Sequence, residues 1–249
     1  VPAMSRKILI TGGAGFIGSW ACKHFIASGF SVTNLDKLTY AANLTTLRSL
    51  ERHPRYQFIQ GDIADASLVS TILHENEIDA VLNLAAETHV DRSIAAPADF
   101  IQTNMVGTFN LLRAVMDYFD DLPRSAQQEF RFVHVSTDEI YGSLAEDGFF
   151  GEDAPSNPRS PYAASKAASD HLVSAFFHTY GLPVVISNCS NNYGPYQFPE
   201  KLIPLMVLNA VEHRELPVYG QGMNVRDWLH VEDHVRALEM LLVFGTVGE

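Results

Sequence analysis

The fold is decided by the stretch Lys7-Ile8-Leu9-Ile10-Thr11-Gly12-Gly13-Ala14-Gly15-Phe16-Ile17-Gly18. Its first five residues are mostly apolar, as in a short buried strand, and apolar side chains recur at helical spacing after its last glycine. Between the two, Gly12, Gly15 and Gly18 allow a tight turn, close approach to a pyrophosphate and close packing of a helix on a sheet. The stretch therefore predicts a strand, a turn and a helix that bind a dinucleotide.

An acidic residue ends the next predicted strand. Residues 31–35 predict a second strand that leads into Asp36, 18 residues after Gly18. At this place in a dinucleotide-binding unit a carboxylate accepts a hydrogen bond from a ribose 2′-hydroxyl and repels a 2′-phosphate. The sequence therefore favours NAD over NADP, with an ordinary loop aspartate as the alternative interpretation.

Further strands alternate with helical patterns along the chain. Apolar runs at residues 56–60, 80–84, 130–135 and 182–187 predict strands, and the apolar spacing at residues 101–119 predicts a long amphipathic helix. Such alternation implies right-handed crossovers and a parallel sheet. We therefore expect an α/β protein with a Rossmann-type doubly wound parallel sheet.

Three segments make up the predicted domain organisation. Residues 4–187 form a dinucleotide-binding domain, and residues 188–222, which begin with a run of amides and turn formers, form part of a smaller substrate-binding lobe. Residues 223–249 return to the first domain, because residues 231–241 carry the spacing of an amphipathic helix.

The connecting segments carry their own predictions. Residues 120–129 read as a polar connection, and residues 146–160, rich in Gly, Pro, Asp and Ser, as a surface loop or lid. Residues 198–204 predict the start of a helix, and residues 217–220 the start of a strand or turn.

Composition narrows the class of protein. The chain has 249 residues, 47% of them apolar, and a formal net charge of −12. Proteins that bind nucleic-acid backbones carry clustered Lys and Arg, so this charge argues against a nucleic-acid partner. No apolar run approaches the roughly 20 residues that span a bilayer, so we expect no membrane association and a cytoplasmic location.

Neither the cysteines nor the histidines predict a metal site. Cys22 and Cys189 lack the spacing of a disulfide framework or a metal-binding motif. His230 and His234 enclose Glu232 and Asp233, but this spacing matches neither of the common zinc-binding helical motifs. Acids in the first turn of a helix explain Glu232 and Asp233 adequately.

A tyrosine and a lysine lie four residues apart at the start of a predicted helix. Ser160 and Pro161 suit the first positions of that helix, so Tyr162 and Lys166 share one face of it. Lowering a tyrosine pKa from about 10 to near 7 takes roughly 4 kcal/mol, whereas an exposed lysine contact contributes about 0.2 to 1 kcal/mol. We therefore expect burial and the positive ring of an oxidised cofactor to act with Lys166 in making Tyr162 a base.

Two adjacent acids follow the strand predicted at residues 130–135. Thr137, Asp138 and Glu139 come directly after this apolar run. If both carboxyls were ionised they would repel each other, so we expect one pKa to rise and that carboxyl to stay protonated near neutrality. The pair then offers an acid beside a base. A solvated turn is the alternative interpretation.

The apolar stripe at residues 172–180 leaves two interpretations open. It is too broad for one buried face, so it belongs either to a deep core helix or to a helix that faces a partner in a dimer. We carry a homodimer forward as the hypothesis for the assembly.

These motifs resemble a known superfamily. The glycine turn, Ser136-Thr137 and the Tyr162/Lys166 pair resemble the extended short-chain dehydrogenase/reductases. A closer similarity, to the dTDP-glucose 4,6-dehydratase family, rests on Leu35-Asp36-Lys37-Leu38-Thr39-Tyr40, Glu87-Thr88-His89-Val90-Asp91-Arg92-Ser93, Ser136-Thr137-Asp138-Glu139, Ser190-Asn191-Asn192-Tyr193-Gly194-Pro195 and Arg226-Asp227-Trp228.

The resemblance implies a reaction on a nucleotide sugar. Tyr162, helped by Thr137 and Lys166, takes the 4-hydroxyl proton while hydride passes from C4 to NAD. Glu139 removes the C5 proton and Asp138 protonates the leaving C6 hydroxyl, after which hydride returns to C6. The product would be a dTDP-4-keto-6-deoxy-glucose.

By the same resemblance, further residues fall at binding positions. The cofactor positions are Gly12, Gly15, Phe16, Ile17, Gly18, Asp36, Lys37, Asp62, Ile63, Ala85, Ala86, Thr103, Tyr162, Lys166 and Asn192. The substrate positions are Thr88, Thr137, Asn191, Lys201, Leu202, Pro217, Tyr219 and Arg226.

Departures and competing functions accompany the resemblance. Ala42 and Thr88 stand where the family is expected to have Gly and Ser, and the family continues several dozen residues past Glu249, so the substrate lobe is incomplete here. The competing functions are a nucleotide-sugar 4-epimerase or UDP-hexuronate decarboxylase of the same fold, a dehydratase acting on UDP-glucose, and a non-catalytic NAD-binding scaffold. Asp138 and Glu139 favour dehydration, because an epimerase needs no elimination pair.

Overall fold

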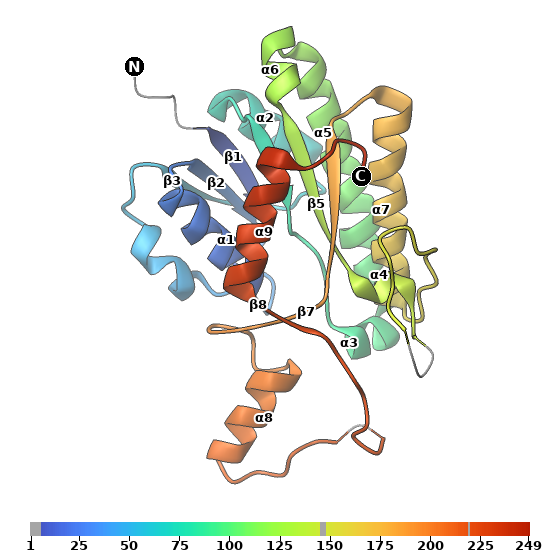
Figure 1. The fold of residues 1–249 in the computed structure, drawn as a ribbon. Coiled ribbons are helices and arrows are strands. Elements are labelled where there is room, and N and C mark those ends of the chain that lie inside the picture. The colour runs from blue at the N-terminus through green and yellow to red at the C-terminus, as the bar shows by residue number, and fades with distance from the viewer. Residues whose placement is uncertain (1–5, 145–147, 219) are drawn as a thin grey trace.

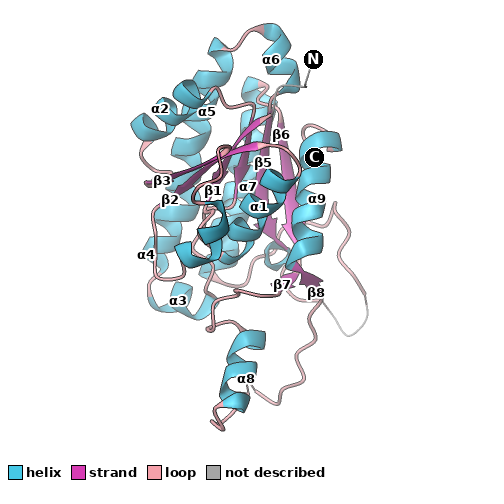
Figure 2. Ribbon diagram, turned by 90° about the vertical axis from the view of Figure 1, so that its left-hand side faces the viewer, coloured by secondary structure: helices cyan, strands magenta, loops and turns pink. Residues whose placement is uncertain are grey.

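The computed structural model describes residues 6–144, 148–218 and 220–249. Within these residues a six-stranded sheet has the order β3-β2-β1-β4-β5-β6, and every neighbouring pair is parallel. Helices cover both faces of this sheet (Figures 1 and 2). The predicted doubly wound parallel sheet is thereby confirmed, and its strand order changes direction between β1 and β4.

The strands of this sheet are short, as is usual in globular proteins. They are β1 (Lys7–Thr11), β2 (Ser31–Asp36), β3 (Tyr56–Gln60), β4 (Ala80–Asn83), β5 (Arg131–Thr137) and β6 (Val184–Cys189). The predicted runs at β1 and β3 match to the residue, whereas β5 and β6 each end two residues later than predicted. The extension pairs Ser136 with Asn188 and Thr137 with Cys189, so polar residues continue the ladder toward one edge.

The helices follow the strands in alternation along most of the chain. They are α1 (Phe16–Ala27), α2 (Ala66–Asn76), α3 (Val90–Ala95), α4 (Pro97–Phe100), α5 (Thr108–Asp121), α6 (Arg124–Glu129), α7 (Pro161–Tyr180), α8 (Leu202–Val211) and α9 (Val231–Phe244), with shorter or wider turns at η1 (Leu44–Leu50), η2 (Ile101–Gly107) and η3 (Asp138–Tyr141). At the start of α7, the Ser160 hydroxyl accepts a hydrogen bond from the backbone N–H of Ala163 at 3.1 Å, and Pro161 is the first helical residue. The predicted helix start is confirmed.

The long helix predicted at residues 101–119 begins differently. Its first part, η2, is a π-helix, and the α-helix α5 starts only at Thr108. Asn104 within η2 donates to the carbonyl of Glu87 at 3.0 Å and to the hydroxyl of Ser165 at 2.9 Å, so side-chain bonds accompany the wider turn. Hydrophobic spacing does not distinguish a π-turn from an α-turn over so few residues.

Two of the predicted connections need separate comment. The polar connection predicted at residues 120–129 contains a helix, α6, which was missed because none of its residues is buried and it therefore has no apolar stripe. Residues 148–160 contain neither helix nor strand, in line with the predicted loop, whereas Glu146 and Asp147 lie outside the described residues. At residues 217–220 the structure has a turn that includes Gly220 and no strand among the described positions.

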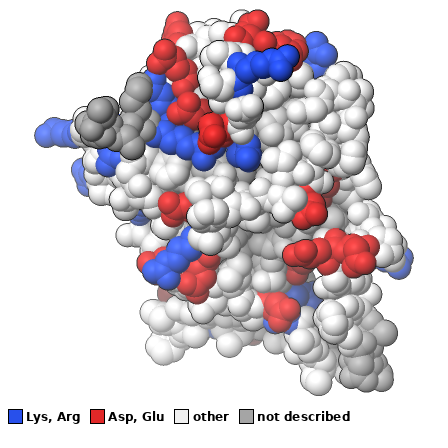
Figure 3. Space-filling model, turned by 45° about the horizontal axis from the view of Figure 1, so that its top comes forward, with Lys and Arg blue, Asp and Glu red and all other residues white. Residues whose placement is uncertain are grey.

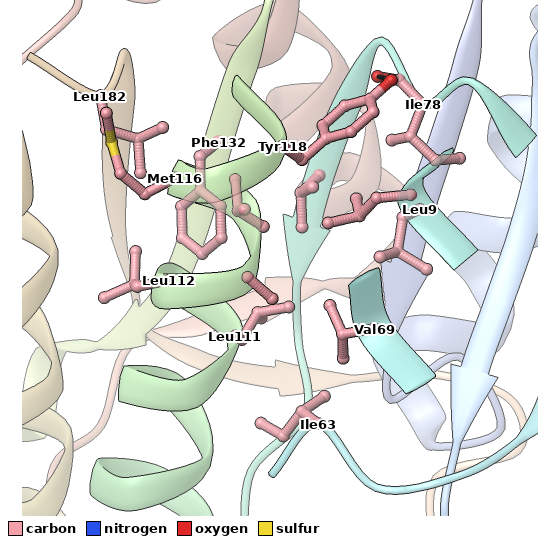
Figure 4. Close-up of a cluster of buried hydrophobic side chains, with 14 of the residues drawn as sticks. Leu9, Ile63, Val69, Ile78, Leu111, Leu112, Met116, Tyr118, Phe132 and Leu182 are labelled. Carbon is pink, nitrogen blue, oxygen red and sulfur yellow. Dashed lines mark hydrogen bonds between the residues drawn. The ribbon is translucent and has the colours of Figure 1, made fainter. Parts of the chain in front are cut away.

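The core has two layers, one on each face of the sheet. On one face, residues from α2, α5 and α7 pack on the strands, as the close-up in Figure 4 shows for Val69, Leu111 and Phe132. On the other face, α1 and α9 pack on the sheet, with Phe25, Val235 and Leu238 fully buried. Burying a side chain of this size contributes roughly 1.5 to 3 kcal/mol. The sheet is thus held rigidly between the layers, and its carboxyl edge becomes a fixed platform.

A smaller unit extends from this edge. β7 (Asn191–Tyr193) pairs in parallel with β8 (Trp228–His230), and α8 lies well away from the large sheet (Figure 2). After β8 the chain returns in α9, which contacts α1, β5 and β6. β6 runs through Cys189, two residues beyond the boundary predicted at residue 187.

Acidic and basic side chains are mixed on the surface. On the face that Figure 3 shows, Asp and Glu side chains lie among Lys and Arg, with uncharged surface between the groups. The acids outnumber the bases in the sequence, 29 against 17. Among the described residues, no helix is long and apolar enough to cross a membrane.

Candidate active site

The glycine turn lies where three backbones approach one another. Gly12 has a φ of 71°, and a Cβ built on it would lie 2.8 Å from the backbone of Ala85 after β4. A Cβ on Gly18 would overlap the carbonyl oxygen of Gly12. On Gly15 it would meet only that same oxygen, at 3.3 Å, and Gly15 lines a cavity. Gly12 and Gly18 therefore permit close packing within the protein. Gly15 has no side chain to fill the cavity that it lines.

Asp36 fastens the glycine turn to the end of β2. Its two carboxylate oxygens accept hydrogen bonds from the backbone N–H groups of Ala14 at 2.9 Å and Leu38 at 2.8 Å. A carboxylate offers about four lone-pair sites, so two stay available toward the cavity that Asp36 also lines. Its neighbour Lys37 donates to the Thr103 hydroxyl at 2.9 Å.

The acid pair lies at the carboxyl end of β5. Thr137 caps η3, since its hydroxyl accepts a hydrogen bond from the backbone N–H of Glu139 at 3.3 Å. Thr137 also donates to Asp138 at 3.3 Å. The cap turns the chain sharply at the strand end, so both acids line the same cavity.

Burial dominates the protonation of both acids. It is the largest cause that raises the pKa of Asp138 and also the largest that raises the pKa of Glu139, for which the charge of Asp138 comes second. Arg226 lowers the pKa of each, and Lys201 lowers that of Glu139. Mutual repulsion alone was expected to raise one of the two pKa values; instead the low-dielectric surroundings raise both.

Tyr162 and Lys166 project from the first two turns of α7 into the buried wall of the cavity. Their exposed fractions are 7% and 4%. Burial raises the pKa of Tyr162, the charge of Glu139 raises it further, and a hydrogen bond with Thr137 lowers it. The Lys166 ammonium donates to the carbonyl oxygen of Val135 at 2.8 Å. Burial and the neighbouring carboxylates therefore favour the neutral phenol in the protein alone.

The cavity brings together most residues predicted from the sequence. All the predicted catalytic and cofactor-binding residues line it, and so do four of the predicted substrate residues, namely Thr88, Thr137, Asn191 and Lys201. These residues come from the carboxyl ends of the strands and from the segments that follow them. This edge of a doubly wound sheet, where the strand order reverses, is the usual ligand site of the fold.

The other predicted substrate residues lie elsewhere. Leu202 and Pro217 are exposed and do not line the cavity. Arg226 is also outside its lining, although its charge acts on both acids. Tyr219 lies outside the described residues.

The segment at residues 197–201 closes one side of the cavity. The Tyr40 hydroxyl donates to Glu200 at 2.9 Å, and the Lys201 ammonium donates to the carbonyl oxygen of Thr88 at 3.0 Å. The ring of Tyr40 also meets Phe198 edge-on, with 5.7 Å between ring centroids. These contacts join the extending unit to the loops that follow β2 and β4, so this unit forms part of the cavity wall.

Several residues at this site were missed from the sequence. Cys189, Phe198 and Glu200 line the cavity. His134 and Asp170 lie buried behind Lys166, with His134 Nε2 3.5 Å from the lysine ammonium. A signal was present for Asp170, which follows Lys166 by four residues as Lys166 follows Tyr162.

A metal centre finds no support in the described part of the chain. No group of three or more His, Cys, Asp or Glu side chains there is arranged to hold an ion. His234 is instead buried and donates from Nδ1 to Asn192 at 2.7 Å, while His230 caps α9. The two histidines thus serve different local contacts.

Comparison with known proteins identifies similar chains. A family model described as GDP-mannose 4,6 dehydratase matches residues 9–247. A protein of Xanthomonas campestris pv. campestris (strain B100) called dTDP-glucose 4,6-dehydratase is 59% identical over 241 residues, which are 97% of this chain and 69% of that protein.

Solved structures agree with this similarity. The dTDP-glucose 4,6-dehydratase DesIV from Streptomyces venezuelae, crystallised with NAD, has a TM-score of 0.90 at 46% identity, with 98% of this chain and 74% of that chain covered. A UDP-glucuronic acid 4-epimerase from Bacillus cereus, in complex with UDP-glucuronic acid and NAD, has a TM-score of 0.87 at 29% identity, with 97% and 74% covered. The fold is thus shared with epimerases, whereas the higher identity is to a dehydratase.

Proposed function

This chain belongs to the dTDP-glucose 4,6-dehydratase family, and from that premise we propose that it converts dTDP-glucose to dTDP-4-keto-6-deoxy-glucose. The observation that carries the proposal is the position of Asp138 and Glu139 in the same cavity as Tyr162 and Lys166. Besides NAD, which would accept the hydride, oxidation at C4 needs only the tyrosine and the lysine from the protein. Loss of water across C5 and C6 needs an acid and a base as well, and the strand end provides both.

The cavity fits an NAD cofactor. The turn is too tight for side chains at Gly12 and Gly18, so backbone N–H groups can approach a pyrophosphate at the start of α1. Asp36 provides the acceptor for a ribose hydroxyl and disfavours a 2′-phosphate. When bound, NAD would accept the hydride from C4 and provide the hydride for C6.

Tyr162 would take the proton of the 4-hydroxyl at its phenol oxygen. Its burial and the charge of Glu139 both raise its pKa, so it needs stabilisation of the phenolate. Lys166 and the positive cofactor ring supply that stabilisation, and each pKa unit corresponds to about 1.4 kcal/mol. Thr137 assists, because its hydrogen bond lowers the Tyr162 pKa. The base would thus be active only when the oxidised cofactor is in place.

The acid pair would divide the elimination. Asp138, whose pKa burial raises, keeps a proton for the leaving C6 hydroxyl. Glu139 would take the C5 proton: burial and the charge of Asp138 raise its pKa, and Lys201 and Arg226 lower it. Because Arg226 lowers the pKa of both acids, Lys201 is the cation that would favour Glu139 as the base.

Substrate contacts are part of the same proposal. Thr88, Asn191 and Lys201 line the side of the cavity that the 197–201 segment closes, where the nucleotide sugar would lie. Arg226, whose charge acts on both acids, would approach the substrate from the loop before β8. The division at residues 4–187, 188–222 and 223–249 remains our proposed domain organisation, and cytoplasm remains the proposed location.

Parallel incubations with different nucleotide sugars separate the competing functions. The protein is mixed with NAD and dTDP-glucose, and the sugar nucleotide is analysed by mass spectrometry. Loss of one water is the expected result, whereas an isobaric product would indicate an epimerase and loss of carbon dioxide from a UDP-hexuronate would indicate a decarboxylase. UDP-glucose run in parallel tests the base, and no change with any of these nucleotide sugars would leave only a binding scaffold.

The glutamate base has a variant of its own. Glu139→Gln keeps the shape of the side chain and removes the charge, so turnover and exchange of the C5 hydrogen with solvent deuterium should both be largely lost while NAD binding survives. Glu77→Gln changes an exposed glutamate far from the cavity, in an ion pair with Lys7, and should leave both intact. Undiminished dehydration by Glu139→Gln would remove this residue from the mechanism.

We also propose that the protein is a homodimer through η2, α5 and α7. Ile101, Phe109 and Tyr180 are 45%, 42% and 52% exposed, and Phe109 and Tyr180 both contact the ring of Phe176. An exposed apolar group of this kind on adjacent helices suits an interface with a second copy. Sedimentation should give the mass of two chains, and Phe109→Glu should give the mass of one.

A further inference from the structure

A row of polar side chains crosses the centre of the large sheet. Thr11, Asn83 and His134 occupy equivalent positions on β1, β4 and β5, paired in register. The Thr11 hydroxyl donates to Asn83 Oδ1 at 2.7 Å, and Asn83 Nδ2 lies 3.0 Å from His134 Nδ1. Because Asn83 Oδ1 is already an acceptor, its Nδ2 is the donor, so His134 Nδ1 accepts. The neutral ring then carries its proton on Nε2.

The row ends at a buried carboxylate beside Lys166. His134 Nε2 is 3.3 Å from Asp170 Oδ1 and 3.5 Å from the Lys166 ammonium. Asp170 Oδ2 accepts a hydrogen bond from the Ser136 hydroxyl at 2.6 Å. Asp170 Oδ1 is buried, and the protonated Nε2 of His134 is the polar atom that approaches it, at the long distance of 3.3 Å. One oxygen of the carboxylate is thus anchored by Ser136, and the other faces the histidine.

The sequence of α7 explains why these groups meet. Tyr162, Lys166 and Asp170 are spaced by four residues, so they lie in line along one face of the helix. That face packs on β5, from which Ser136 and His134 point back. Lys166 thus has the phenol one turn before it and the carboxylate one turn after it.

We propose that Asp170 is the buried counter-ion of Lys166, and that neutral His134 is the spacer that holds the carboxylate and the ammonium apart at a fixed geometry. Both are positioning residues, because they act on the reaction through Lys166. The inference rests on the proposed function in so far as Lys166 serves Tyr162. It concerns the charge of Asp170, on the side of the lysine away from the cavity, whereas the catalytic groups already described line the cavity.

Electrostatics favour this assignment. An ammonium that is only 4% exposed loses most of its hydration, and a buried charge without a partner costs several kcal/mol. Burial lowers the pKa of Lys166, and Asp170 is the largest influence that raises it. Burial, and after it the charge of Lys166, lowers the pKa of His134, which keeps the ring neutral at physiological pH.

Other titratable groups surround Lys166 and are distinguishable from Asp170. Cys189 on β6 faces it as well and raises its pKa less than Asp170 does. Asp138 and Glu139 act from η3 on Tyr162. Asp170 acts on Lys166, whose pKa it raises, so its charge is expected to reach Tyr162 through the lysine.

The first experiment follows C4 oxidation alone. Single-turnover formation of the reduced cofactor from dTDP-glucose is recorded against pH for the wild type and for Asp170→Asn, which keeps the size of the side chain and removes its charge. Loss of the counter-ion lowers the Lys166 pKa. The alkaline limb of the pH–rate profile should therefore move to lower pH by about one unit. Superimposable profiles would overturn the proposal.

Two variants test whether the shift is specific. Asp79→Asn removes a carboxylate that accepts the backbone N–H of Lys7 at 2.7 Å, before β4 at the other end of the strand, and should leave the limb in place. His134→Gln removes the spacer and keeps both charges, so the rate should fall while the limb stays. A limb shift in His134→Gln as large as in Asp170→Asn would overturn the role of a neutral spacer.

A stability cycle tests the charge pair without reference to activity. Lys166→Met leaves the Asp170 carboxylate buried without its cation, so adding Asp170→Asn should raise the melting temperature of Lys166→Met by several degrees. A double variant that melts below Lys166→Met would overturn the counter-ion role. Because this measurement needs no substrate, it remains informative if Asp170→Asn alone folds poorly or if dTDP-glucose is not the substrate.

Discussion

Asp36 Oδ2 accepts a hydrogen bond from the backbone N–H of Ala14 at 2.9 Å, so the carboxylate that faces the cofactor cavity also holds the glycine turn closed. Asp36→Ala removes this bond together with the acceptor for a ribose hydroxyl. Hydrogen bonds to charged groups contribute about 1.5 to 3 kcal/mol each, so NAD affinity should fall at least about tenfold. Calorimetric titration with NAD measures the change.

Asp79→Ala is the matched control for this variant. Asp79 also accepts a backbone N–H, that of Lys7, but at the opposite edge of the sheet from the cavity. NAD affinity should be unaltered in this variant even if the protein becomes less stable. An equal loss of affinity in both variants would show that Asp36 acts only through general stability.

Gly12 and Gly181 separate backbone strain from steric contact. Both have a left-handed φ, 71° and 76°, but a Cβ would meet the Ala85 backbone at 2.8 Å on Gly12 and nothing within 4 Å on Gly181. Backbone strain should cost about 1 to 3 kcal/mol at either position, and Gly12→Ala should cost more than this because its Cβ also meets the Ala85 backbone; urea unfolding measures both. Only Gly12→Ala should also lose NAD binding. Retention of full NAD affinity by Gly12→Ala would contradict the close approach at this turn.

Lys201 tunes the proposed base. Its positive charge lowers the pKa of Glu139, which must be unprotonated to accept the C5 proton. Lys201→Gln therefore raises the Glu139 pKa, and the acid limb of C5 hydrogen exchange should move to higher pH. Lys201→Arg keeps the charge and should leave the limb near its wild-type position. A limb that does not move in Lys201→Gln would argue against Glu139 as the titrating base.

His234 should make the folded state sensitive to acid. The side chain is 2% exposed, and burial lowers its pKa to about 4 from an ordinary value near 6.5. Between these two values the unfolded chain binds a proton that the folded chain does not, so stability falls as pH drops through this window, by about 3 kcal/mol in all. Urea unfolding at several pH values measures the fall.

His234→Gln should flatten that pH dependence. The substitution removes the titrating ring and keeps an amide donor near Asn192, which accepts from His234 at 2.7 Å. His171→Gln, at an exposed position on α7, is the comparison and should leave the slope unchanged. An unchanged slope in His234→Gln would assign the acid sensitivity to other groups.

The large sheet and the glycine turn were predictable because their signals are local. Residues 7–11 form a short apolar run, as expected for β1 in the interior of a parallel sheet, which is apolar on both faces. The alternation of strands with helical patterns predicted the parallel sheet, whereas the order of its strands was not predicted. Helix α6 and the π-turn at η2 were not predictable, since neither depends on an apolar stripe.

The residues that line the cavity were predictable, whereas the buried polar residues on the other side of Lys166 were not. The sequence indicates Thr137 by its position at a strand end, and Tyr162 and Lys166 by their spacing of four residues. Asn83 and His134 look like ordinary polar residues within strands, and they meet only because β4 and β5 pair in one particular register. Such a partnership between residues 51 positions apart cannot be seen in the sequence of either strand.

The polar row of Thr11, Asn83 and His134 also bears on how the sheet assembles. A slip of one residue between β4 and β5 would turn the side chains of one strand to the opposite face and separate Asn83 from His134, while the Thr11–Asn83 pair between β1 and β4 would stay. Asn83 Nδ2 and His134 Nδ1 would then each be buried without this partner, at roughly 1 to 3 kcal/mol each. Apolar strands could pair in several registers during folding. The polar row favours the one register in which its hydrogen bonds form, and that register also completes the site around Lys166.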